Sequence, residues 1–93
     1  MPYNFLTGIK ELPDNTIQLF PNPASNNFQL QFSGQPPDKT YLQIYNGLGQ
    51  QVMEREINSS FTTVNRGKLS NGVYFWQVLQ GEQVLQRGKL ILQ

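Results

Sequence analysis

The chain has 93 residues, and its seven lysine and arginine residues against six aspartate and glutamate residues give a formal net charge of +1 at pH 7. This length fits one domain, and so balanced a charge argues against nucleic acid or an anionic membrane surface as the partner. The sequence contains no histidine and no cysteine, which removes the usual general base, thiolate metal sites and disulfides. We therefore expect a protein without catalytic activity, cofactor or bound metal.

Residues 1–15 show no sustained hydrophobic period, and glycine and proline interrupt them. We expect them to be a linker or leader, and the folded domain to occupy residues 16–93. Asp14, Asn15 and Asp38 carry oxygen atoms of the kind that bind Ca²⁺, but they do not form a spaced ligand series. Turn formation explains these three residues more simply.

After this segment the pattern is that of short strands separated by turns. The first strand is expected at residues 16–20, and Pro21 ends it because proline has no N–H to donate to a neighbouring strand. Residues 27–32 alternate between apolar and amide side chains, which puts one face on a core and the other in water. Between the two strands, Pro21 and Pro23 fix the backbone φ and keep Asn22 out of the α region, which predicts a rigid corner.

Residues 46–49, Asn-Gly-Leu-Gly, favour a hairpin connection in the middle of the chain. Asn-Gly suits the positive φ angles of a tight turn, and the second glycine predicts a slightly longer loop. Residues 72–80 are apolar on both faces, as is typical of a central strand. Leu69, in the irregular stretch before them, is expected to close one end of the core. The strands expected after the first two are residues 39–46, 50–57, 61–64, 72–80 and 83–92.

Seven short strands with turns at intervals of about 8–12 residues predict an all-β domain, namely a single seven-stranded antiparallel β-sandwich. Its architecture would be immunoglobulin-like but without the disulfide, because the chain has no cysteine. Glycine or proline interrupts every segment that is long enough for a helix.

Two groups of side chains raise the question of a ligand. Glu54 and Glu56 share one strand face, but a glycosidase needs two carboxylates across a cleft, so we interpret them as solvated strand charge. Tyr45, Tyr74 and Trp76 would suit stacking on sugar rings, and the 9 asparagines and 12 glutamines suit neutral polar ligands. Packing of these aromatics in the core is the other interpretation. A carbohydrate-binding or adhesive module of a secreted hydrolase therefore stays an alternative.

Four motifs occur in a fixed order along the chain: Phe-Pro-Asn-Pro-Ala at residues 20–24, Asn-Gly-Leu-Gly at 46–49, Leu-Ser-Asn-Gly-Val-Tyr at 69–74 and Gly-Lys-Leu-Ile-Leu at 88–92. Over residues 17–93 this series resembles the C-terminal sorting domain of the type IX secretion system, of the kind called type A. No single motif is specific for this family, but the order of the four motifs and the position of the last one at the carboxyl end are specific for it. The residues that carry the resemblance as a sorting motif are Pro21, Asn22, Pro23, Gly47, Gly49, Gly72, Val73, Tyr74, Gly88, Lys89, Leu90 and Ile91.

The resemblance implies that the domain is covalently continuous with an N-terminal cargo protein of a Gram-negative bacterium. It also implies export to the periplasm, recognition by the type IX translocon, and release at the cell surface or outside the cell, without insertion into the membrane. A sortase-like peptidase would cleave upstream of the proline motif, within residues 1–15, and attach the cargo to an anionic lipopolysaccharide. One position departs from the family pattern, because Gln93 stands where a basic residue is common.

The last expected strand, at residues 83–92, is the segment that we expect a partner to recognise. If it lies at a sheet edge, its N–H and C=O groups could pair with a strand of a receptor. The proline corner and the glycines would then serve mainly to build the sandwich. A passive spacer between domains is a third interpretation, which the position of the last motif disfavours.

Overall fold

The computed structural model of the protein describes residues 16–93, which form seven β-strands. All seven strands lie within two residues of the positions expected from the sequence, which confirms the all-β prediction. Residues 1–15, with Asp14 and Asn15, lie outside the described part, so the linker there stays a prediction. The strands are β1 (Ile17–Phe20), β2 (Asn27–Phe32), β3 (Thr40–Tyr45), β4 (Gln51–Ile57), β5 (Phe61–Asn65), β6 (Gly72–Gln80) and β7 (Gln83–Leu92).

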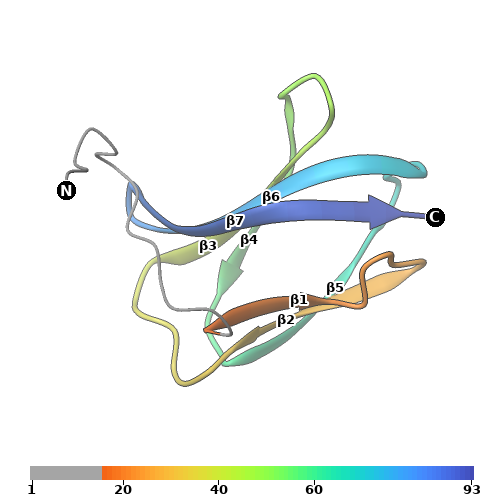
Figure 1. Cartoon of the computed structure of the whole chain (residues 1–93). Helices are drawn as coiled ribbons and strands as arrows, with labels where there is room; N and C mark the ends of the chain where they lie inside the picture. Colours follow the sequence, from red (N-terminus) through yellow and green to blue (C-terminus); the bar gives the residue numbers. More distant parts are fainter. Residues whose placement is uncertain (1–15) are drawn as a thin grey trace, which may run out of the picture.

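Within residues 16–93 the strands form two antiparallel sheets, one with the order β1-β2-β5 and one with the order β4-β3-β6-β7. The sheets face each other as the two layers of a sandwich (Figure 1). In immunoglobulin constant-type domains the fourth strand joins the sheet of the first two strands, whereas here β4 pairs with β3. In the order of the four-stranded sheet, β7 is an edge strand. β6 lies between β3 and β7, as expected of the most apolar segment.

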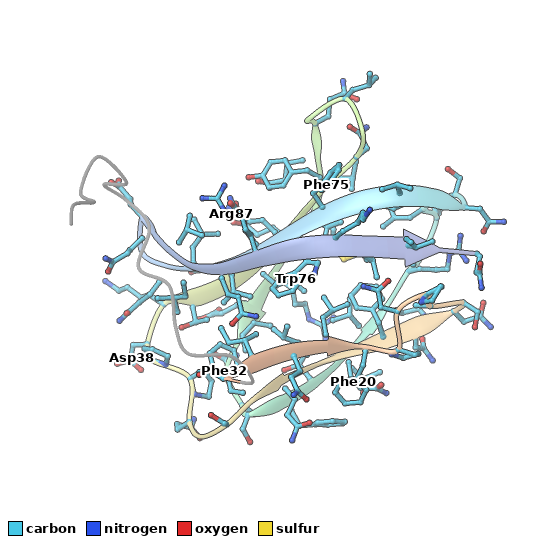
Figure 2. All side chains as sticks on the ribbon, viewed as in Figure 1. Phe20, Phe32, Asp38, Phe75, Trp76 and Arg87 are labelled. Atoms are coloured by element: carbon cyan, nitrogen blue, oxygen red, sulfur yellow. The ribbon has the colours of Figure 1, made fainter. Side chains whose placement is uncertain are left out.

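The core lies between the two sheets and follows from the period-two alternation of the strands. Phe28 and Leu30 of β2 in one sheet, and Leu42 and Ile44 of β3 in the other, are all fully buried in this core. Trp76 of β6 also lies between the sheets (Figure 2). Its neighbours in β6 face the other way, so the alternation separates a core face from an outer face. The buried apolar residues are Ile17, Ala24, Phe28, Leu30, Phe32, Leu42, Ile44, Ile57, Val64, Tyr74, Trp76, Val78, Leu85, Leu90 and Leu92, with Leu69 packed against them as predicted.

The β3–β4 connection is a loop that the side chain of Asn46 holds in shape. Its Oδ1 accepts hydrogen bonds from the main-chain N–H groups of Leu48 (2.9 Å) and Gln50 (3.0 Å). The positive φ of +84° falls on Gly49 and not on Gly47, so the tight Asn-Gly turn is not formed. The prediction of a longer loop is confirmed, whereas the prediction that Gly47 adopts the positive φ of a tight turn is wrong.

Among residues 16–93 there is no helix that is long and apolar enough to cross a membrane. The same residues contain no group of three or more histidine, cysteine, aspartate or glutamate side chains that could hold a metal ion. Glu54 accepts a hydrogen bond from Gln43 across the β3–β4 pair (3.1 Å), on the exposed face where the sequence placed it.

Candidate functional site

The proline loop, residues 21–24, runs along the outer edge of β7. The peptide bonds before Pro21 and Pro23 are both cis. The side chain of Asn22 donates from Nδ2 to the carbonyl oxygen of Lys89 (2.6 Å) and accepts at Oδ1 from the N–H of Ile91 (3.0 Å). One side-chain amide thus takes the place that the backbone of a neighbouring strand would have.

Ala24 continues this pairing with its own backbone. Its N–H donates to the carbonyl oxygen of Ile91 (2.8 Å), and its carbonyl oxygen accepts from the N–H of Gln93 (2.9 Å). These bonds form an isolated parallel bridge between Ala24 and Leu92, and both side chains are buried. The first and last motifs, 67 residues apart between Asn22 and Lys89, therefore form one structural unit.

This unit changes what the edge of β7 can do. β7 lies at the sheet edge that the sequence argument required, but the proline loop already occupies the main-chain groups from Lys89 to Gln93 that point outward. Towards its other end the β6–β7 pairing has a register shift at Val78 and Leu79. Covered edges and bulges both discourage the addition of another strand. Recognition through side chains therefore fits this edge better than strand addition.

Arg66 holds the same end of the sandwich together, and the sequence analysis did not single it out. Its Nη1 donates to the main-chain oxygens of Ser25 (2.7 Å) and Gln93 (3.2 Å), and its Nη2 donates to Oδ1 of Asn71 (2.7 Å). Its Nε donates to the carbonyl oxygen of Leu69 (3.1 Å). A guanidinium has five N–H donors in a fixed plane, which suits such a junction. The sequence carried no signal for it, because these partners are brought together only by the fold.

The third motif joins the last one through the β6–β7 pair. Gly72 begins β6 and lies opposite Leu92, and Val73 lies opposite Ile91. Tyr74 is buried, and its hydroxyl donates to the carbonyl oxygen of Ser70 (2.7 Å), which fixes the loop that leads into β6. Tyr74 and the buried Leu90 therefore build the core, while Val73 faces outward.

Gly88 is the position where Trp76 needs space. The two residues face each other across β6 and β7, and a Cβ at Gly88 would lie 2.9 Å from three atoms of the indole ring. The ring therefore covers the bare backbone of the glycine, an arrangement that stabilises glycine in strands. The close approach explains why this motif contains glycine in mid-strand.

The outer face of the four-stranded sheet has a groove of about 640 Å³, which we call the outer groove. Gly47 and Gly49 of the β3–β4 loop lie on one side and Arg87 and Lys89 of β7 on the other. Phe75 lies on its floor, and Figure 2 shows Phe75 and Arg87 on the side of the sheet away from Trp76. The structure thus brings together residues of the second, third and fourth motifs, while the proline loop pairs with the adjacent strand edge.

A family model described as the secretion system C-terminal sorting domain matches residues 18–93 of the chain. The chain belongs to this family. No curated protein matches the chain. The sorting domain therefore carries a C-terminal sorting signal for type IX secretion, and the resemblance inferred from the four motifs is confirmed.

Membership in this family has three consequences for the sorting domain. It interacts with the type IX secretion machinery, it is continuous with a cargo protein, and the destination is the cell surface or the extracellular space. The family is not an enzyme family.

The aromatic platform of the carbohydrate-binding alternative is not present in the sorting domain. Tyr74 and Trp76 are each only 6% exposed, so neither ring can stack on a sugar. The hydroxyl of Tyr45 donates to Oε1 of Gln43 (2.7 Å), which also accepts from Gln77 (3.0 Å). The amides here hold one another across the sheet, as a solvated β surface does.

Replacing Asn22 by alanine tests the pairing of the proline loop with β7. We expect the free energy of unfolding to fall by about 1–2 kcal/mol, because two hydrogen bonds worth about 0.5–1.5 kcal/mol each are lost. We also expect faster hydrogen exchange at the Ile91 amide, whose acceptor is the Asn22 side chain. Urea denaturation and exchange measured by NMR are the two readouts.

Asn26→Ala is the matched control, because this exposed asparagine lies four residues further on and its side chain forms no hydrogen bond within residues 16–93. The control should leave both readouts unchanged. An Ile91 amide that exchanges at the same rate in Asn22→Ala and in the original protein would contradict the pairing.

Proposed function

We propose that residues 16–93 direct an N-terminal cargo protein through the periplasm and across the outer membrane by the type IX translocon, with no catalytic activity of their own. A sortase-like peptidase then cleaves within residues 1–15 and attaches the cargo to the cell surface. The residues of the sorting motif contribute in two ways. The residues that build the sandwich are Pro21, Asn22, Pro23, Gly72, Tyr74, Gly88 and Leu90. The residues that shape or face its outer surface are Gly47, Gly49, Val73, Lys89 and Ile91.

The observation that carries this proposal is that the first, third and fourth motifs, which are distant in the sequence, meet at one end of the sandwich, and that the second motif borders the same outer groove. Asn22 bonds to Lys89 and Ile91, and Arg66 bonds to the residues that follow the proline loop and precede β6. Such a unit is a folded surface that the secretion machinery can read independently of the cargo.

Fusion of residues 1–93 to the carboxyl terminus of a periplasmic reporter tests the export step. In a strain with a functional type IX system we expect the reporter at the cell surface or in the medium, measured by fractionation and surface protease accessibility. The same fusion in a strain without the translocon should accumulate in the periplasm. A reporter that stays in the periplasm of both strains would overturn the proposal.

The cleavage step has a separate readout. Mass spectrometry of the exported reporter should find a new carboxyl terminus within residues 1–15, together with an increase in mass from the attached surface glycolipid. Exported reporter that keeps all 93 residues would refute cleavage and leave the export step standing.

A further inference from the structure

We propose that the outer groove binds an extended segment of a partner protein that carries an apolar side chain flanked by carboxylates. This inference rests on the proposed function, because the partner would be a component that reads the sorting signal. The occupant follows from the apolar floor of the groove, its unpaired cations and the fixed shape of its walls.

The floor of the groove exposes apolar surface in the middle of a sheet. Val73 and Phe75 are each 48% exposed, although β6 has a strand on either side. Leu48, at the tip of the β3–β4 loop, is 86% exposed. Leu48 does not line the groove, but Val73 and Phe75 lie two residues apart on its floor, and neighbouring exposed apolar side chains of this kind mark an interaction site. Figure 2 shows Phe75 on the outer side of the sheet.

Two cations border this apolar floor. Lys89 lies opposite Phe75 in the β6–β7 register, and Arg87 lies opposite Gln77. Both are exposed, and neither forms an ion pair within residues 16–93. The carboxylate on the same cross-strand row is Glu54, which is three strands away from Arg87, a distance of about 14 Å. Arg87 and Lys89 are therefore available to pair with carboxylates of a partner.

The walls of the groove are fixed before any partner arrives. Asn46 holds the β3–β4 loop through its hydrogen bonds to Leu48 and Gln50. On the floor, Gln77 donates to Oε1 of Gln43, which the hydroxyl of Tyr45 also bonds. A surface that is already ordered loses little conformational entropy on binding, which favours affinity for a partner.

The covered edge of β7 decides how a partner lies on this surface. Because the proline loop pairs with Lys89 and Ile91, a partner strand cannot extend the sheet there. It must lie over the face, where an apolar side chain meets Phe75 and carboxylates on either side of it meet Arg87 and Lys89. An anionic headgroup would satisfy the cations but would leave Val73 and Phe75 uncovered.

A peptide titration of the 93-residue chain tests this docking, followed by amide chemical shifts. The probes are three synthetic 12-residue peptides: one alternates glutamate with leucine, one has serine in place of leucine, and one has lysine in place of glutamate. We expect the glutamate–leucine peptide to shift the amides of Tyr45, Val73, Phe75, Arg87 and Lys89. Each of the other two peptides should bind about tenfold more weakly.

Three variants sharpen the result. Phe75→Ser should weaken binding of the glutamate–leucine peptide about tenfold. Phe61→Ser is the matched control, since Phe61 is 51% exposed on the other sheet, and it should bind as before. The double variant Arg87→Glu with Lys89→Glu should exchange preference, losing the glutamate–leucine peptide and gaining the lysine–leucine peptide. Circular dichroism confirms that each variant is folded.

Several outcomes would overturn the inference. Equal binding of the glutamate–serine peptide would mean simple charge attraction, and tighter binding to anionic phospholipid vesicles would mean a headgroup site. Shifts that depend on protein concentration without peptide would mean that a second copy of the chain occupies the groove. Shifts clustered around Phe20 and Phe61 would place the site on the other sheet.

The reporter fusion separates this inference from the proposed function. If the original fusion is exported and Phe75→Ser is exported equally well, the docking inference fails and the sorting function stands. If no fusion is exported while the titration gives the expected preferences, the groove stands and the sorting function fails.

Discussion

Deletion of residues 89–93 is expected to unfold the sorting domain as well as to stop export. The deletion removes Leu90 and Leu92, which are 0% and 1% exposed, together with the partners of Asn22 and Ala24. Each leucine alone contributes about 2–5 kcal/mol in a core of this kind. The free energy of unfolding of a whole domain is about 5–15 kcal/mol. Loss of both leucines and of the pairing with the proline loop therefore removes most of the stability.

Thermal unfolding followed by Trp76 fluorescence and circular dichroism measures this effect. We expect the shortened chain to show no cooperative transition at 25 °C or above, whereas the original chain unfolds in one step. A shortened chain with an unchanged transition would contradict the structural unit formed by the first and last motifs.

Export of the deletion variant alone cannot distinguish recognition from folding, and Lys89→Gln separates the two. The Lys89 side chain is exposed, so its exchange for glutamine should change the free energy of unfolding by no more than about 0.5 kcal/mol. If the outer groove is the recognition surface, this folded variant still exports less of the reporter than the original fusion does.

The strands and the core could be predicted because they depend on local pattern. The strict alternation of residues 27–32 places Phe28 and Leu30 inward, and the structure has them fully buried. Turn residues set the number of strands in the same way. Both features follow from neighbours in sequence, so one sequence is enough to infer them.

The contacts of the sorting motif could not be predicted in this way. Pro21 and Pro23 indicated a corner, but nothing in their neighbourhood showed that Asn22 bonds to a strand 67 residues further on. Arg66 lies in a stretch that the sequence marked only as irregular, and its partners come from three separate segments. Such contacts depend on which strands are neighbours in space, and the residue pattern does not specify this order.

The aromatic residues of β6 show the same limit. In a strand Tyr74 and Trp76 lie on one face and Val73 and Phe75 on the other, and the sequence analysis found both faces apolar. Which face is inside was therefore open, and the sugar-binding alternative depended on that choice. Because Trp76 is buried, the aromatic side chain of β6 that can contact a partner is Phe75, which is half exposed beside the cations of β7.

Gly88→Ala is expected to destabilise the sorting domain by about 1–3 kcal/mol, although it is the smallest possible change. The new Cβ would lie 2.9 Å from Nε1, Cε2 and Cζ2 of Trp76, closer than carbon atoms approach in packed proteins. The indole is 6% exposed and lies in a packed core, so it cannot move aside without disturbing its neighbours. A loss of this size lowers the melting temperature by about 4–8 °C for each kcal/mol in a domain of this length.

Two controls show whether contact with the ring causes the loss. Gly47→Ala should be neutral within about 0.5 kcal/mol, because a Cβ there meets no atom within 4 Å and the φ of Gly47 is not positive. In a Trp76→Leu background the ring is absent, so adding Gly88→Ala should cost less than it does in the original chain. An equal cost in both backgrounds would mean that the glycine is needed for the backbone of β7, and that the fourth motif does not owe its glycine to Trp76.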